Sequence, residues 1–195
     1  NYSGKLYLDG LHDRAHIFIN KQLKGIIYRN DKNNYISLDK LKGENDIDVL
    51  VENMGRINYG PEMPDRKGVR QIRIDNQVLS HWDVWLLPLD NVVKLDFSTP
   101  KKTAPVFMKG SFKAQPGKSC FVHLNGFTKG YVYVNGFNLG RYWKVGPQKS
   151  LYLPGVLLKE TNEVIVLELD NTIADTISIL DWHDIGQKKS IFSKK

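Results

Sequence analysis

The chain carries the same order of segments twice, and this repeat constrains its fold more than any other feature. The repeated segments are 17–20 with 132–135, 36–38 with 151–153, and 45–50 with 162–167. The first two pairs share one offset, and the third is shifted by two residues, as a loop insertion would produce. Gly25 and Gly140 follow the first pair at matching places. A repeat of this length predicts two copies of one small β domain, because solenoid units are shorter.

Local patterns predict strands throughout. Residues 47–52 and 71–75 alternate between apolar and polar side chains, which is typical of a strand with one solvated face. Residues 16–19, 131–134 and 164–169 are apolar on both faces, as in a sheet covered on both sides. No window has sustained helical spacing, so the predicted fold class is all-β.

The repeat also predicts the domain boundaries. Residues 90–105 lose the alternation and contain Ser98, Thr99, Pro100 and Pro105, which is typical of a linker. We therefore expect a first β-sandwich over 1–89, a linker over 90–105 and a second β-sandwich over 106–195. The first copy is expected to lack an edge strand that residues upstream of Asn1 would supply.

Composition restricts the partners and the cofactors. The chain has 195 residues, a net charge of +7 and a pI near 9.3, but its lysines are scattered rather than clustered. We interpret them as a solvated surface and expect no nucleic acid partner. Cys120 is the only cysteine, so no internal disulfide and no thiolate metal cluster can form. No apolar run is long enough to cross a bilayer, and we expect neither a membrane partner, a metal nor a cofactor.

The residues that could carry catalysis are dispersed. The five histidines show no metal-binding pair, and His12-Asp13 precedes a predicted strand as a turn would. The carboxylates considered are Glu52, Glu62, Glu160 and Glu168. They fall at predicted strand ends or turns, where capping or solvated groups are common. We predict no catalytic residue in this chain.

One segment resembles the first ribonucleoprotein signature of RNA-recognition motifs. Residues 129–136 carry the lysine, glycine and aromatic residues of that signature. Val132 replaces its small fourth residue, Gly136 replaces its terminal aromatic, and the helices of that fold are not predicted. RNA binding through this segment is therefore the weakest of the functional alternatives.

Longer blocks resemble the C-terminal β region of glycoside hydrolase family 35 β-galactosidases. The blocks are Asn53–Gly60, Val134–Trp143, Leu8–Ala15, Gly126–Gly130, Gly146–Gln148 and Leu151–Pro154, together with Trp82 and Pro88–Asp90. They cover most of the chain outside the linker and the last dozen residues. The resemblance implies two jelly-roll β-sandwiches of the galactose-binding-like kind that follow a catalytic (β/α)8 barrel. It implies that the barrel carries the glutamates of a retaining mechanism, and that the parent enzyme releases terminal β-D-galactosyl residues.

The resemblance also implies roles for particular residues and a location. Tyr59 would help wall the galactose pocket of the barrel, with Arg56 and Asn58 supporting its loop; the alternative is that Tyr59 packs on its own domain. The chain's partners would be that barrel and, through it, the galactoside. The location implied is extracytoplasmic: periplasmic, secreted or lysosomal.

Five further residues have two interpretations each. Asn135, Arg141, Tyr142, Trp143 and Trp82 would form either carbohydrate contacts or contacts between domains. An aromatic face can stack on a sugar ring while Arg or Asn binds its hydroxyls. We favour an interdomain wedge anchored by Trp143, with Arg141 bonded to backbone carbonyls. Trp82 is expected on a strand and buried.

Three functions follow from these patterns. The first is a non-catalytic region that packs on a β-galactosidase barrel and completes its pocket. The second is an independent carbohydrate-binding module, and the third is an RNA-binding protein. Under the first, the isolated chain should expose an apolar patch and associate with itself.

Overall fold

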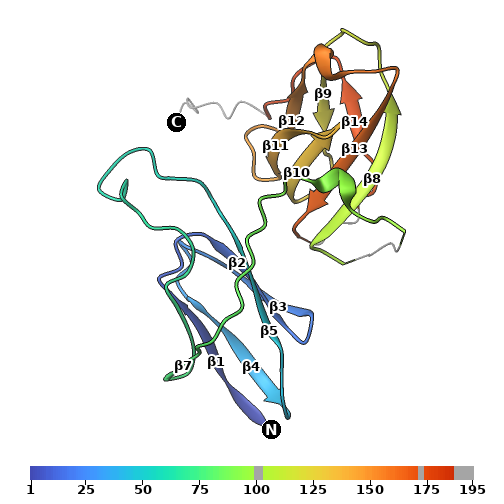
Figure 1. Ribbon diagram of the computed structural model, residues 1–195. Helices are drawn as coiled ribbons and strands as arrows, with labels where there is room; N and C mark the ends of the chain where they lie inside the picture. Colours follow the sequence, from blue (N-terminus) through green and yellow to red (C-terminus); the bar gives the residue numbers. More distant parts are fainter. Residues whose placement is uncertain (99–102, 171–173, 187–195) are drawn as a thin grey trace, which may run out of the picture. The chain divides into compact units, whose positions relative to one another are not determined.

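The computed structural model describes residues 1–98, 103–170 and 174–186. It divides the chain into two compact units, Asn1–Leu86 and Leu87–Lys195 (Figure 1). All strand pairings in both units are antiparallel. In the described ranges the only helical elements are the 3-10 turns Val92–Lys94 and Gly155–Leu157. The prediction of an all-β chain is confirmed.

The first unit is a sandwich of two sheets. Its strands are β1 (Tyr2–Asp9), β2 (Arg14–Ile19), β3 (Gln22–Tyr28), β4 (Tyr35–Leu41), β5 (Ile47–Glu52), β6 (Gln71–Ile74) and β7 (Gln77–Val78). One sheet has the order β4-β1-β6-β7 and the other the order β3-β2-β5. Leu6 and Leu8 of β1 pack in one core with Ile17 and Ile19 of β2, and all four are at most 2% exposed. Each such side chain contributes about 1.5–3 kcal/mol of transfer free energy.

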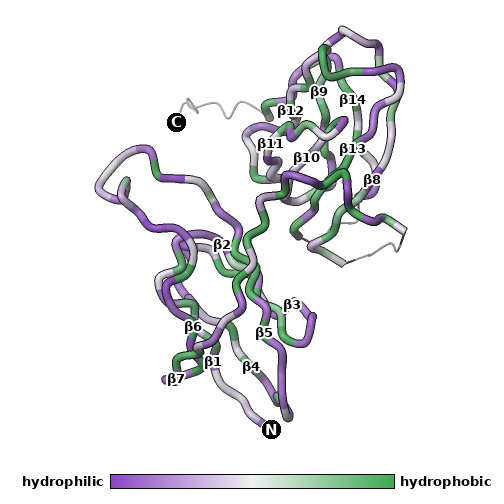
Figure 2. Tube along the Cα trace, in the orientation of Figure 1, coloured by the Kyte–Doolittle hydropathy of each residue, from purple (hydrophilic) through white to green (hydrophobic). Residues whose placement is uncertain are grey.

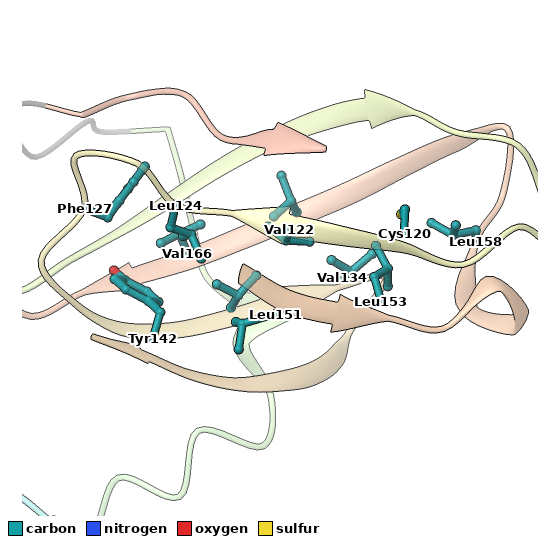
Figure 3. Packing of buried hydrophobic residues seen from close by; sticks show 12 residues of the cluster. Cys120, Val122, Leu124, Phe127, Val134, Tyr142, Leu151, Leu153, Leu158 and Val166 are labelled. Atoms are coloured by element: carbon teal, nitrogen blue, oxygen red, sulfur yellow. The ribbon is translucent and has the colours of Figure 1, made fainter. Parts of the chain in front are cut away.

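The second unit repeats this plan. Its strands are β8 (Val106–Lys113), β9 (Cys120–His123), β10 (Lys129–Val134), β11 (Phe137–Trp143), β12 (Ser150–Leu153), β13 (Thr161–Glu168) and β14 (Ser178–Leu180). The sheets have the orders β11-β10-β13-β8 and β12-β9-β14. Figure 3 shows the core, in which Val122 and Leu153 of one sheet meet Val134 and Val166 of the other.

A shared register relates the two units. β2, β3, β4 and β5 correspond to β10, β11, β12 and β13, and Ile19 lies opposite Ile47 as Val134 lies opposite Val164. Each unit adds one strand to this common frame at a different place. In the first unit β7 extends the sheet beyond β6, and in the second β8 pairs with the outer side of β13.

The repeated asparagine of the first unit closes the turn between β2 and β3. Asn20 has a φ of 50°, a region that asparagine tolerates better than most residues. Its side-chain amide donates to Asn45 Oδ1 at 2.9 Å, and its Oδ1 accepts the Asp46 amide at 2.9 Å. The turn is thereby joined to the start of β5.

The repeated asparagine of the second unit makes the same connections. Asn135 also has a φ of 50°, and it bonds the side chain of Asn162 at 2.9 Å and the amide of Glu163 at 3.0 Å. It also donates to the Leu157 carbonyl at 2.8 Å. The repeated asparagine therefore makes equivalent side-chain hydrogen bonds in both units. These hydrogen bonds occupy the side chain of Asn135, for which a carbohydrate or interdomain contact was expected.

Part of the segment expected as a linker belongs to the second unit. Val92 is 4% exposed and packs with Tyr133 and Ile165, and Leu89 and Phe97 pack against the same cluster. Apolar residues that lie outside the repeat thus cover the outer face of the sheet at β10 and β13. Residues 99–102 of the expected linker lie outside the described residues.

The segment 79–89, called the joining segment below, is not a strand. We expected Trp82 on a strand, but β7 ends at Val78, and His81 has a φ of 60° that breaks an extended run. Pro88 further on lacks the N–H that a central strand needs. Figure 2 shows hydrophobic residues along this segment.

Candidate functional site

The first unit presents one long connection between β5 and β6, and its residues 53–68 are called the Tyr59 loop below. Gly55 and Gly60 have φ values of 86° and 97°, which allow the sharp bends at the ends of its tip. Tyr59 lies between them and is 88% exposed. The tip therefore projects its aromatic side chain into solvent.

A buried acid holds both ends of this loop. Asp13 precedes β2 and is 1% exposed. Its Oδ1 accepts the Met54 amide at 2.8 Å, and its Oδ2 accepts the Gly68 amide at 2.7 Å. The Lys67 ammonium lies 2.5 Å from Asp13 Oδ1 and donates to the Gly55 carbonyl at 2.8 Å. Charge-assisted bonds of this kind are about twice as strong as neutral ones, so the base of the loop is fixed.

A second anchor lies on the C-terminal half of the loop. Asp65 accepts from Arg29 at 2.5 Å and pairs with His12 at 2.5 Å. The hydrogen bond from Arg29 holds the pKa of Asp65 below its usual value, and His12 acts in the same direction. Arg29 also pairs with Glu62 at 3.5 Å. The turn before β2 and the end of β3 together hold the loop from outside it.

The residues we expected to support the loop do not do so. Within residues 1–98, neither Arg56 nor Asn58 makes a side-chain hydrogen bond or ion pair in the structure, and both are exposed beside Tyr59. Tyr59 does not pack on its own unit. The support comes instead from Asp13, Arg29 and the loop's own Lys67, whose burial and convergence no local pattern reveals.

In the second unit, residues 141–143 at the end of β11 lie partly in the core and partly at the surface. Tyr142 is 7% exposed and donates to Glu168 Oε2 and the Leu167 carbonyl, each at 3.0 Å. Burial, with the nearby Glu168 carboxylate, raises the pKa of Tyr142 far above its usual value. Tyr142 is thus a core residue. Arg141, its neighbour, is exposed, and no bond from Arg141 to a backbone carbonyl is present in the described part of the chain.

Trp143 belongs to a buried charge cluster of the second unit, and the first unit has a counterpart of this cluster. Its ring lies over the Lys129 ammonium, 4.6 Å from the ring centroid, and Lys129 is 0% exposed. In the first unit Tyr28 covers Arg14 in the same way, at 5.0 Å. In each pair, the cation and the aromatic residue lie directly opposite each other on neighbouring strands. One role of Trp143 is therefore to cover this cation within its own unit.

Trp143 also lines a cleft of about 340 Å³ in the second unit. The side chains of His123 and Asp184, which lie 3.3 Å apart, form part of the wall. The other residues around the cleft include Asn125, Gln148 and Lys149. An aromatic side chain beside amide and charged groups suits a polyhydroxylated ligand.

The segment that resembles an RNA-binding signature does not present the surface this function needs. Tyr133 is 3% exposed and packs with Val92, while Lys129 is 0% exposed. Base stacking needs open aromatic faces on the sheet. The RNA-binding alternative therefore has no support from this segment.

The joining segment is apolar and open. Val84, Trp85 and Leu86 are 79%, 82% and 88% exposed, and Leu87 is 63% exposed. Trp82 is 36% exposed and its indole donates to the Leu79 carbonyl at 3.2 Å. Four consecutive large apolar residues in solvent are typical of a surface that another domain covers.

The buried carboxylates are used structurally. Glu52 pairs with Arg14 at 3.0 Å. Glu168 accepts the amides of Thr128, Lys129 and Asp170. No group of three metal-ligating side chains occurs among the described residues. In the same ranges no helix is long and apolar enough to cross a membrane.

Fold and loop together define a tandem of two antiparallel β-sandwich domains that presents a tethered aromatic loop. Residues 2–90 match the family model for the first all-β domain of β-galactosidase, and residues 105–163 match that for the galactose-binding domain of β-galactosidase. The chain is 35% identical over 191 residues to a β-galactosidase of Bos taurus, which covers 84% of this chain and 29% of the relative. It is 37% identical over 177 residues to a β-galactosidase-1-like protein of Mus musculus, covering 84% and 27%. A β-galactosidase of Xanthomonas manihotis is 33% identical over 153 residues, covering 77% and 26%.

The chain belongs to the β-galactosidase family, glycoside hydrolase family 35, and its two units are non-catalytic β-sandwich domains of that family. It spans less than a third of the length of these curated relatives.

Proposed function

We propose that the two units are the accessory region of a β-galactosidase that hydrolyses terminal β-D-galactosyl residues. In this function they pack on the catalytic barrel of the same polypeptide, and Tyr59 helps to complete its galactose pocket. The observation that carries the proposal is the Tyr59 loop, which is fixed at its base by Asp13 and open at its tip. A residue with a purely internal role would not be left 88% exposed at the tip of a loop whose base is fixed.

The chemistry of Tyr59 suits this role. Its ring offers an apolar face to the carbon side of a sugar, and its hydroxyl can bond a sugar oxygen. Because Asp13 and Asp65 already fix the base and the C-terminal half of the loop, binding has less free energy of ordering to supply. Preorganisation of this kind places a pocket wall at low cost in affinity.

The joining segment supplies the packing surface in this proposal. Burying Val84, Trp85, Leu86 and Leu87 against the barrel would remove a large apolar area from water, at about 25 cal/mol per Å². Without the barrel the same surface promotes association between copies, and we expect the isolated chain to dimerise or aggregate. We also propose the extracytoplasmic location that the family resemblance implies.

The first experiment tests the division of labour. The purified 195-residue chain is incubated with 4-nitrophenyl β-D-galactoside, and we expect no turnover, because the catalytic carboxylates belong to the barrel. Turnover by a preparation free of other galactosidases would contradict the proposal.

The second experiment tests Tyr59 in the full-length enzyme. We expect Tyr59→Ala to raise KM by about tenfold, or about 1.4 kcal/mol, with Tyr59→Phe intermediate. The control is Tyr152→Ala, which removes a half-exposed tyrosine from the second unit and should leave KM unchanged. Equal kinetics for Tyr59→Ala and the control would remove Tyr59 from the pocket.

A second candidate function rests on the cleft beside Trp143. An independent carbohydrate-binding module would use that cleft of about 340 Å³, with Gln148 and Lys149 as hydrogen-bonding groups. Calorimetric titration of the chain with galactose and galactan oligomers tests it. Binding heat that is lost in Gln148→Ala would favour this module. If no heat is measured, the accessory role is the remaining function.

A further inference from the structure

The sheet β3-β2-β5 of the first unit has an open edge at β5. β5 pairs with β2 along Ile47–Glu52, and among the described residues no strand lies on its other side. The corresponding strand of the second unit is covered. β13 pairs with β10 on one side and with all eight residues of β8 on the other (Figure 1).

The core is less well closed at this edge than at its counterpart. Val49 lies opposite Ile17 and packs against the first core, yet it is only half-buried. Its counterpart Val166 is 4% exposed, because it lies opposite Met108 of β8, which packs against the second core. The same contrast separates Ile47, half-buried, from Val164, which is 6% exposed.

The backbone of β5 also has donors and acceptors directed toward the open edge. The Asn20 amide bonds the Asp46 carbonyl at 3.0 Å, so Asp46 faces β2. Because antiparallel pairing alternates, the next residues that face away from β2 are Ile47, Val49 and Val51. The residues of β13 at the first two of these places lie opposite Gly110 and Met108 of β8.

We propose that the open edge of β5 binds an extended segment of the same polypeptide, encoded directly before Asn1, which pairs antiparallel with β5 as β8 pairs with β13. This segment would carry apolar residues at alternate positions, to cover Ile47 and Val49, and polar residues between them. An edge strand that is left open favours pairing with another chain, so this segment also protects the fold from aggregation.

The internal repeat fixes where this segment lies in the sequence. β8 ends at Lys113, and after a short connection β9 begins at Cys120. β9 is the counterpart of β1, which begins at Tyr2. A counterpart of β8 therefore falls immediately upstream of Asn1. The curated relatives are longer than this chain, which covers 29% of the Bos taurus protein.

Amide hydrogen exchange tests the proposal. Two proteins are compared by NMR: the 195-residue chain, and the same chain extended by the thirty residues encoded before Asn1. We expect the amides of Ile47, Val49 and Val51 to exchange at least a hundredfold more slowly in the extended protein. The amides of Val164 and Val166, already covered by β8, serve as the internal control and should exchange equally in both.

Three results would overturn the proposal. The first is unchanged exchange at β5 in the extended protein. The second is protection of these amides in the 195-residue chain at every concentration, which would mean that this chain covers its own edge. The third is protection in the 195-residue chain that rises with concentration alongside dimer formation in sedimentation, which would make a second copy the occupant. None of these results depends on Tyr59 or on galactoside binding, so this proposal can fail independently of the proposed function.

Discussion

The two units share one frame but use the position before the second strand of that frame differently. In the first unit Asp13 stands there, and its carboxylate holds a long loop that is open at its tip. In the second unit Thr128 stands at the matching place, and its amide donates at 2.9 Å to Glu168, buried at the end of β13. The same position of the frame thus serves a loop in one unit and the end of β13 in the other. Function can be added at a strand connection without changing the strands.

A second difference concerns how each core is closed. The second unit covers β13 with β8, and it covers the outer face of the same sheet with Val92. In the first unit, among the described residues, β5 ends the sheet. One unit carries its closing elements within this chain, and the other is proposed to receive one from upstream.

The largest expected effect is on the acid that holds the loop. Asp13→Ala should lower the free energy of unfolding of the first unit by about 3–5 kcal/mol, because it leaves Lys67 and two backbone amides without their buried partner. The control is Asp48→Ala, an exposed acid on β5. Urea unfolding, with amide exchange resolved for each unit, measures both. A loss confined to the second unit would contradict the assignment.

The next largest effect is the loss of stability when a core valine is truncated in β13 or in β5. Val166→Ala should cost about 2 kcal/mol, since its side chain is 4% exposed. Val49→Ala should cost less, about 1 kcal/mol, because its side chain is only half-buried. The two variants are compared by the same unfolding measurement. Equal costs would show that the open edge leaves the first core no less complete than the second.

Removing the asparagine side chain of the repeated turn should lower the free energy of unfolding more in the second unit than in the first. Asn135→Gly keeps the positive φ but removes bonds to Leu157, Asn162 and Glu163, and should cost about 1–3 kcal/mol. Asn20→Gly should cost about 0.5–1.5 kcal/mol, because Asn20 is exposed and water can replace its partners. Asn33→Gly, at an exposed loop position, is the control. The reverse order would mean that solvent exposure does not set these costs.

The smallest effects are opposite responses to pH. Hydrogen bonding from Arg29 lowers the pKa of Asp65, so its stabilisation is present above the unfolded pKa and is lost as the pH falls through the folded pKa. Burial raises the pKa of Glu168, so the second unit loses stability as the pH rises from the unfolded value of about 4.5 toward the folded pKa. Substituting Asp65→Asn should flatten the dependence below about pH 4, and Glu168→Gln should flatten the dependence above about pH 4.5, when unfolding is measured as a function of pH. Slopes of the same sign for both acids would contradict this.

The repeated frame could be predicted because its determinants are local. Alternation marked β5 and β6, and Asn20 and Asn135 marked the turns that the structure closes with side-chain bonds. The cover of β10 and β13 by Val92 could not be predicted, because that contact lies outside the repeat and joins residues distant in sequence. The segment 90–105 was therefore interpreted as a linker throughout.

The candidate site was predictable only in part. The Tyr59 loop was located through its resemblance to a family, but its anchors depend on the burial of Asp13, which a dipeptide before a strand does not reveal. Tyr142 was interpreted with its neighbours as a surface contact. Gly130 lies directly opposite Tyr142, and a Cβ there would lie 1.7 Å from the Leu167 carbonyl oxygen and 2.8 Å from the Tyr142 hydroxyl, so the close approach of the neighbouring backbone requires glycine.

The buried pair of Arg14 and Glu52 has a consequence for how such domains evolve. The two side chains are 0% and 5% exposed and lie 3.0 Å apart. Losing the carboxylate first strands a cation in the interior, and losing the cation first strands an anion, so either single step is strongly unfavourable even where an apolar replacement of both would be tolerated. Substituting both residues together avoids that unfavourable intermediate state. This strong epistasis preserves a charged interior in a domain that has no catalytic use for it.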